Sequence, residues 1–229
     1  MIGDDEFEPR LGRMRGAGGK RARKYLGRVL AATNLARGGT GKIGGRGGAF
    51  SGSRIGRGAG IGCVLAGRGH RGAFAARRVI IKVSIVRLAG KGAAAAGAHL
   101  RYLQRDGTTR DGEAGRLYGA DDDSVDARAF RARGSGDRHQ FRFIVSCEDG
   151  DQYEDLKPLT RRLMTRVEQD LGTRLDWVAV DHFNTDQPHT HVMLRGVDDR
   201  GENLVIAREY IAHGFRERAA ELATIDLGP

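Results

Sequence analysis

The spacing of apolar and polar residues along the chain changes near residue 78. Before this position, runs such as "ARGGTGKIGGRGGAFSGSRIGRGAG" (36–60) show no sustained apolar period, and 21 of the 36 glycines lie in residues 1–77. Such a stretch buries too little apolar surface to offset the entropy of ordering it. We therefore predict a largely disordered arm over residues 1–78 and an ordered domain over residues 79–229.

Periods of two and of about 3.6 residues predict strands and helices in the second region. In "HQFRFIVS", Phe141, Phe143 and Val145 alternate with other residues, as in a strand with one core face. The predicted elements are, in chain order, a buried strand at 78–88, a helix at 92–106, a polar loop at 107–138 with one short helix, a strand at 139–146, a helix at 151–172, strands at 175–183 and 189–196, a short strand "NLVI" (203–206) and a helix at 207–224.

This order of elements predicts the fold class. Strands and helices follow one another as β-α-loop-β-α-β-β-α. We expect an α+β sandwich in which helices pack on a mainly antiparallel sheet, with about five strands if residues 203–206 form one.

Charge divides the chain at the same place as the apolar pattern. Residues 1–78 carry 17 Lys and Arg against 4 Asp and Glu, whereas residues 79–229 carry 22 against 25. A flexible basic arm beside a nearly neutral domain suits a polyanion such as nucleic acid, bound through phosphate contacts that ignore base sequence. The alternative is a solvated linker whose composition has no binding role.

Composition also indicates the cellular compartment of the protein. The two cysteines, Cys63 and Cys147, form neither a ligand pair nor a disulfide framework, as is usual in a reducing environment. The chain contains no apolar run of membrane-spanning length, and no signal peptide follows Met1. We expect a cytoplasmic protein without membrane insertion.

Three of the seven histidines fall in "DHFNTDQPHTHVMLRG" (181–196). Side chains at i and i+2 of a strand share a face, so His189 and His191 should project side by side. The six residues after His182 suffice to join two antiparallel strands and bring it alongside the pair. Three neutral imidazoles can then bind a metal ion and leave positions open for water or substrate.

A metal site beside a basic arm could polarise a phosphate oxygen, and the missing part is a nucleophile. Tyr102 in "HLRYLQRDG" lies on a predicted helix between Arg101 and Arg105, whose charges would favour a phenolate and attract a phosphate. On the helix alone, a tyrosine that packs its ring and exposes its hydroxyl is the more common case. His99, one turn earlier, could lie near the site, although an ordinary helical position is more common for such a residue.

These two motifs together resemble those of a known family. "HFNTDQPHTHVML" resembles the histidine motif of conjugative relaxases in the HUH endonuclease superfamily, in particular the VirD-like and MobA-like mobilisation nucleases. "HLRYLQRDG" resembles their tyrosine-bearing helix, and "RHQFRFIVSCEDG" their middle strand. The likeness covers about residues 79–224 and keeps the motifs in the family's order.

The resemblance implies a function and a set of roles. Tyr102 would attack a scissile phosphodiester, and His182, His189 and His191 would bind a divalent ion, Mg²⁺ or Mn²⁺. Asp186 matches an acidic position of the motif and would orient a histidine or help to deprotonate Tyr102. The substrate would be single-stranded DNA at an origin of transfer, nicked for plasmid or element mobilisation with accessory DNA-binding proteins and a type IV secretion coupling protein. The family's fold is a five-stranded antiparallel sheet with helices.

Several further expectations accompany this interpretation. Unpaired DNA needs basic contacts, for which Arg101 and Arg105 are candidates, and stacking platforms, for which Phe183, Trp177 and Tyr118 are candidates. Relatives often continue beyond the nuclease domain, so we expect a C-terminally truncated or minimal form.

Three other functions stay open at this point. A histidine-triad nucleotide hydrolase would need a third alternating histidine where the chain has Met193. A metal-dependent phosphodiesterase would use bound water in place of Tyr102. A non-catalytic DNA-binding mobilisation accessory protein would need only the basic arm.

Overall fold

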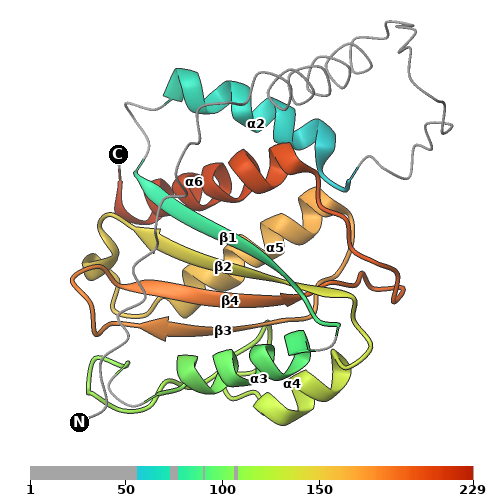
Figure 1. The fold of residues 1–229 in the computed structure, drawn as a ribbon. Helices are drawn as coiled ribbons and strands as arrows, with labels where there is room; N and C mark the ends of the chain where they lie inside the picture. Colours follow the sequence, from blue (N-terminus) through green and yellow to red (C-terminus); the bar gives the residue numbers. More distant parts are fainter. Residues whose placement is uncertain (1–55, 73–76, 90, 106–107, 229) are drawn as a thin grey trace, which may run out of the picture. The chain divides into compact units, whose positions relative to one another are not determined.

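Within the described residues, four antiparallel strands form one sheet in the order β1-β2-β4-β3. The structure is a computed structural model that describes residues 56–72, 77–89, 91–105 and 108–228. Figure 1 shows the strands lying side by side, and their bounds are β1 (Val79–Arg87), β2 (His139–Cys147), β3 (Trp177–His182) and β4 (His189–Arg195). The expected α+β class and the antiparallel sheet are confirmed.

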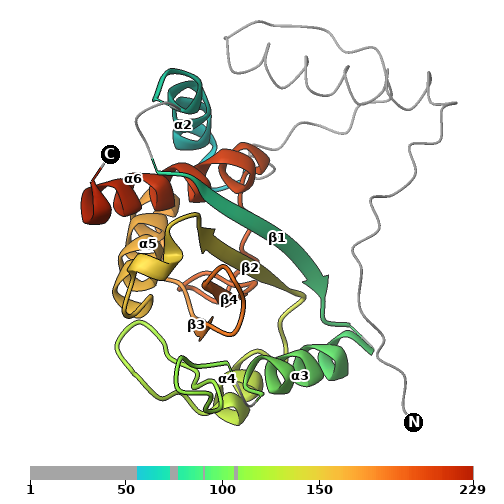
Figure 2. The same cartoon turned by 90° about the vertical axis from the view of Figure 1, so that its left-hand side faces the viewer.

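Helices cover both faces of the sheet (Figure 2). On one face lie α5 (Lys157–Leu171) and α6 (Phe215–Leu227), with the one-turn η2 (Gly150–Gln152) before α5 and the π-helical turn η3 (Tyr210–Gly214) before α6. On the other face lie α3 (Lys91–Leu103) and α4 (Ala127–Arg133). At Gly214 the predicted helix changes from π to α geometry, and it continues through this residue.

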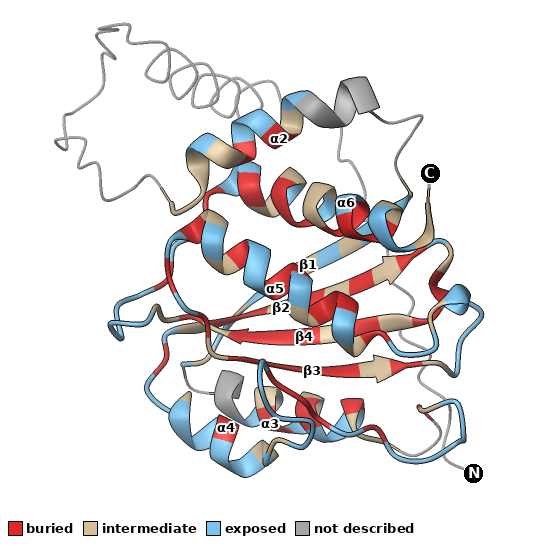
Figure 3. Cartoon of the chain, turned by 180° about the vertical axis from the view of Figure 1, so that it is seen from behind, coloured by how far each residue is buried: buried red, intermediate tan, exposed pale blue. Residues whose placement is uncertain are grey.

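The larger apolar core lies between the sheet and α5 and α6, as the buried residues in Figure 3 show. From β2, the predicted core residues Phe141, Phe143 and Val145 all enter it. The apolar stripe of the helix predicted at 151–172 also lies in this core and consists of Leu156, Leu159, Leu163, Val167 and Leu171. Gly172 ends α5 in the left-handed conformation (φ 63°) that glycine adopts without strain.

A smaller apolar core lies on the opposite face, under α3 and α4. It joins Leu100 and Leu103 of α3 and Phe130 of α4 to Met193 of β4, with Val178, Val180 and Leu117. This second core positions α3 over the sheet, which matters because α3 carries Tyr102.

Two strand predictions need correction. Residues 203–206 form no strand: Asn203 makes an isolated bridge to Val197 and Ile206 one to Arg57. The backbone of this run bonds to Arg57 instead: Arg57 N–H donates to the carbonyl of Val205 at 2.7 Å, and Ala207 N–H donates to that of Arg57 at 3.0 Å. The strand at 78–88 is an edge strand and not a buried one, because β1 pairs only with β2 among the described strands and exposes Ile80 and Ile85. A β-branched run alone does not distinguish these two cases.

Part of the predicted arm belongs to the folded unit. Helix α2 (Ala59–Gly72) packs beside η3 and α6, with Leu65 buried in the main core. Arg57 pairs with Asp198 at 2.7 Å. A Cβ on Gly62 would lie 2.6 Å from the Tyr210 backbone nitrogen, so this glycine permits a close approach of helices. The described residues 56–72 therefore belong to the same compact unit as the predicted domain. Residues 1–55 lie outside the described residues.

The predicted long loop folds over the free edge of β3. It contains the expected short helix, α4, and Tyr118 exchanges backbone hydrogen bonds with Ala179 at 2.8 and 3.0 Å. Phe183 donates its backbone N–H to the carbonyl of Thr108 at 2.7 Å. No helix in the described part of the chain has both the length and the apolar character needed to cross a membrane.

Candidate metal centre

The three histidines of the hairpin converge as predicted. His182 ends β3 and pairs in register with His189, which begins β4, while His191 follows two residues later on the same face. Their candidate ligand atoms all lie within 4.8 Å of one another. His189 Nε2 lies 3.2 Å from His191 Nε2, close to what two bonds of about 2.0–2.1 Å to one ion require.

Backbone carbonyls fix the orientation of two of these rings. His182 Nε2 lies 2.9 Å from the carbonyl oxygen of Leu103, and His189 Nδ1 lies 3.0 Å from that of Gln187. A carbonyl only accepts, so each of these nitrogens carries the proton. His182 Nδ1 and His189 Nε2 are then left with lone pairs, as is usual for metal-binding histidines, whose second nitrogen donates to a carbonyl or carboxylate.

The surroundings of His182 and His191 favour the neutral form of these two rings. Burial and the neighbouring His182 and His189 lower the pKa of His191 to about 3. Burial also lowers the pKa of His182, whose ring is almost completely enclosed. Neutral imidazole is the form that binds a metal ion. The three residues could therefore hold an ion through nitrogen ligands, with coordination positions left open.

Helix α3 forms one wall of this centre. The ring of His99 meets that of His191 edge to face, with 6.4 Å between centroids. Leu103 supplies the carbonyl that accepts from His182. His99 is thus a neighbour of the cluster, contrary to the more common expectation for a helical histidine. Burial and the charge of Arg142 lower its pKa to about 4.

Tyr102 lies on α3 directly before Leu103 and three residues after His99. Its side chain is 58% exposed, and the Arg105 guanidinium lies 4.3 Å above its ring. Arg101 is exposed. The sequence placed Tyr102 between two arginines, and the structure brings Arg105 into direct contact with it.

Two arginines near the centre each have one buried guanidinium nitrogen without a hydrogen-bond partner among the described residues. Arg105 Nη1 and Arg142 Nη2 are buried and have no hydrogen-bond partner among the described residues. Arg142 lies on β2, on the same sheet face as the histidines, and its Nε donates to Gln140 Oε1 at 3.3 Å. The charge of Arg105 contributes to the low pKa of His191, and that of Arg142 to the low pKa of His99. An anion would satisfy such donors, since leaving them unpaired is unfavourable. Arg142 gave no signal in the sequence beyond its place in a strand.

Asp186 does not orient a histidine in this structure. It is exposed in the hairpin loop and has no hydrogen bond or ion pair with the described part of the chain. The carbonyl of Gln187 orients His189 instead.

The acid closest to the ligands in sequence is Asp181, which faces the opposite side of the sheet. It accepts hydrogen bonds from Tyr118 Oη at 2.7 Å and Thr190 Oγ1 at 2.6 Å. Burial raises the pKa of its carboxyl to about 6. A lone acid in the apolar run "WVAVDHF" was the signal that could have identified it.

Two of the three candidate stacking platforms are core residues. Tyr118 and Trp177 are 1% and 4% exposed and pack edge to face with each other, so neither can stack on a base. Phe183 is half-buried, and the Arg110 guanidinium lies 4.5 Å above its ring.

Comparison with known proteins gives no further guide to the function of this centre. No model of a known protein family matches the chain, and no similar sequence is found among curated proteins.

Proposed function

We propose that the protein is a metal-dependent nuclease that nicks one DNA strand by attack of Tyr102 on a phosphodiester, the activity that its resemblance to conjugative relaxases implies. The observation that carries the proposal is the junction of α3 with the histidine cluster. His99 contacts His191, and Leu103 accepts from His182, on either side of Tyr102 along the helix. A nucleophile must be held on a rigid element close to the group that activates its target.

The donor set fits a divalent ion. His182, His189 and His191 would hold it, and Mg²⁺ or Mn²⁺ is our proposal for its identity. When bound, the ion would supply Lewis-acid polarisation of a phosphate oxygen and help to orient the phosphodiester.

The residues of the chain would then perform a balanced exchange of bonds. Tyr102 Oη loses its proton to solvent and forms a bond to phosphorus, while the bond from phosphorus to the 3′ oxygen breaks. The departing 3′ oxygen takes up a proton and becomes a free 3′-hydroxyl. The 5′ phosphate remains esterified to Tyr102, so the energy of the phosphodiester is kept and the step can reverse.

The unpaired cations support a phosphate substrate. Arg105 and Arg142 offer buried N–H donors with no carboxylate in ion-pair distance among the described residues. Guanidinium groups bind phosphate oxygens through charge-assisted hydrogen bonds. We propose that Arg105 and the exposed Arg101 contact the DNA backbone, and that the natural substrate is single-stranded DNA at an origin of transfer. Accessory DNA-binding proteins and a type IV coupling protein are the proposed partners.

An assay for a covalent intermediate tests this function. The protein is incubated with a random-sequence pool of single-stranded oligonucleotides and Mn²⁺ or Mg²⁺, and SDS-resistant adducts are counted. A label at the 3′ end should remain on the protein, whereas a label at the 5′ end should be released on a fragment with a 3′-hydroxyl. Sequencing the attached DNA identifies the nick site.

Tyrosine variants make the assay decisive. Tyr102→Phe removes only the attacking oxygen and should abolish the adduct while metal and DNA binding persist. Tyr25→Phe, in a basic stretch outside the described residues, is the matched control and should change nothing. Cleavage without an adduct would instead identify a hydrolase that uses water, and binding without cleavage a non-catalytic DNA-binding protein.

A further inference from the structure

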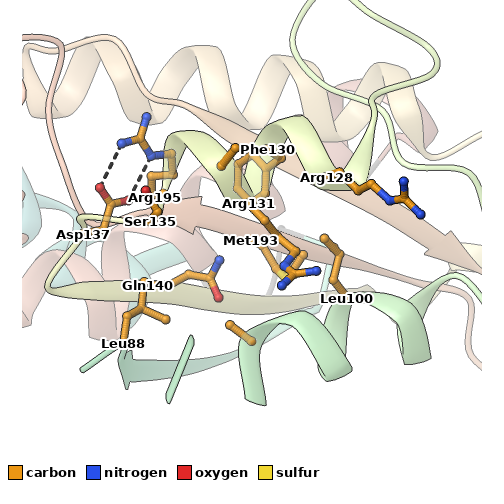
Figure 4. Close-up of a pocket in the computed structure, with 13 residues that line it drawn as sticks. Leu88, Leu100, Arg128, Phe130, Arg131, Ser135, Asp137, Gln140, Met193 and Arg195 are labelled. Carbon is orange, nitrogen blue, oxygen red and sulfur yellow. Dashed lines mark hydrogen bonds and ion pairs between the residues drawn. The ribbon is translucent and has the colours of Figure 1, made fainter. Parts of the chain in front are cut away.

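A pocket of about 430 Å³ lies between α3, α4 and the sheet, on the same face as the histidine cluster (Figure 4). Leu100 of α3 and Met193 of β4 belong to its wall. Leu100 follows His99 directly, and Met193 follows His191 by two residues. At roughly 3.3 Å per residue of strand, the pocket begins about 7 Å from the cluster.

The lining of the pocket is mainly apolar with one amide. Its apolar side chains are Leu88, Ala96, Leu100, Phe130, Ala132 and Met193. The side chain of Gln140 points into the space, and its Oε1 accepts from Arg142 Nε. Its amide nitrogen makes no hydrogen bond to the described residues and is free to donate. Apolar walls with a few placed polar groups suit a ring system with polar edges.

Two arginines give the rim of the pocket its charge. Arg128 and Arg131 of α4 are exposed, and their guanidinium groups have neither a hydrogen bond nor an ion pair with the described residues. A third arginine, Arg195, is held by Asp137 at 2.8 Å and by Asp176 at 3.1 Å, so it is already neutralised. The available charge is therefore on α4.

We propose that this pocket binds one unpaired nucleobase of the DNA strand whose phosphodiester lies at the histidine cluster, an inference that rests on the proposed function. The base lies against Phe130 and Met193 and accepts a hydrogen bond from Gln140. Arg128 and Arg131 contact the phosphates that flank this nucleotide. Double-stranded DNA does not enter, because a base must leave its stack to reach the pocket.

Binding of two probes measures the contribution of the base. Fluorescence anisotropy compares a labelled thymidine oligonucleotide with an abasic oligonucleotide of the same length, so that only the bases differ. We expect the full chain to bind the thymidine probe about tenfold more tightly, a magnitude typical of one stacked base. Equal affinity for the two probes would overturn the proposal.

Filling the pocket should remove this preference. Ala96→Phe places a ring in the pocket, whereas the matched control Ala94→Phe adds the same ring at an exposed position of α3 that does not line it. Ala96→Phe should bring thymidine binding close to the abasic level, and Ala94→Phe should preserve the tenfold ratio. Joint replacement of Arg128 and Arg131 by alanine should weaken both probes equally. The same loss in both phenylalanine variants would contradict the assignment.

A second measurement needs no substitution that could impair folding. A 5-iodouracil oligonucleotide cross-linked to the wild-type protein by light should attach to the peptide that contains Phe130 or to the one that contains Met193. Attachment only elsewhere would overturn the proposal. The ratio of affinities for the thymidine and abasic probes should be the same in Tyr102→Phe as in wild type, because base binding does not require the reaction. The pocket and the nicking activity can also fail separately. If Ala96→Phe loses the preference for the thymidine probe but the wild-type protein forms no covalent adduct, the nicking activity is refuted and the pocket remains a base-binding site.

Discussion

His182 donates its Nε2 proton to the backbone carbonyl of Leu103 at 2.9 Å, which ties the end of β3 to the helix that carries Tyr102. The ring is 1% exposed, so this hydrogen bond is shielded from water. The residue can therefore serve in two ways: its Nδ1 is available to a metal ion, and its Nε2–H helps to fix α3 over the sheet.

Replacing His182 by alanine should therefore affect both metal binding and stability. We expect Co²⁺ affinity, measured by visible absorption, to fall at least tenfold, and the thermal midpoint of the metal-free protein to fall more than in His189→Ala. His213→Ala, remote from the cluster on η3, is the control and should bind Co²⁺ normally. Unchanged affinity in His182→Ala would show that His182 is not a ligand.

Acid should destabilise the metal-free protein through His191. Its pKa is about 3 when folded, against about 6.5 when unfolded, so between these values the unfolded chain binds more protons. Stability is therefore complete above pH 6.5 and is lost as the pH falls toward 3. This residue should contribute a loss of at most about 2 kcal/mol between pH 6.5 and 5.

The contribution of His191 is obtained by difference, from urea unfolding of wild type and His191→Gln over this range. Asp181, whose pKa is raised to about 6, acts in the opposite sense in both proteins and cancels. Parallel pH profiles for the two proteins would contradict the prediction.

Arg142 and Arg195 should respond in opposite ways to replacement by methionine. Arg142 has a buried nitrogen without a partner, so Arg142→Met should keep or raise the thermal midpoint while weakening single-stranded DNA binding about tenfold. Arg195 pairs with Asp137, whose side chain is 4% exposed, so Arg195→Met should cost about 3 kcal/mol of stability. Calorimetry and anisotropy measure the two effects. A destabilised Arg142→Met with normal DNA affinity would indicate a structural role.

Deletions of the N-terminal region should separate charge from folding. Residues 1–50 hold 11 Lys and Arg against 4 Asp and Glu, and their removal should flatten the salt dependence of DNA binding while the domain stays folded. Removal of residues 1–78 also takes away Leu65 and the Arg57–Asp198 pair, and should lower the thermal midpoint. An unchanged salt slope without residues 1–50 would mean that they do not contact DNA.

The structural features predicted best from the sequence are those that depend on residues close together along the chain. The alternation of a strand and a short hairpin loop suffice to bring His182 beside His189, and a helical period suffices to place Leu163 and Val167 in the core. These relationships involve residues within a few positions of each other, so pattern alone determines them.

Features that depend on contacts between segments far apart in the sequence were not predicted. Ile206 forms its bridge with Arg57, about 150 positions away, and does not belong to the four-stranded sheet. The packing of α2 on η3 depends on the fit of Gly62 against Tyr210. In a glycine-rich sequence nothing distinguishes this glycine from the others. The unpaired nitrogen of Arg142 likewise results from which elements surround β2, and not from its own sequence.

The hydrogen bonds from Tyr118 and Thr190 to Asp181 help to fix the register of β3 on β4, and with it the position of the candidate metal centre. Asp181 and His182 are consecutive, so strand alternation sends the carboxylate to the core and the imidazole to the opposite face. A slip of one residue would exchange them, leaving a carboxylate at the cluster and a histidine against Tyr118. The two hydroxyls that hold Asp181 oppose that slip. Asp181, which is not part of the histidine cluster, thus determines which side chains face it, so the candidate ligand set and the alignment of β3 on β4 are encoded together.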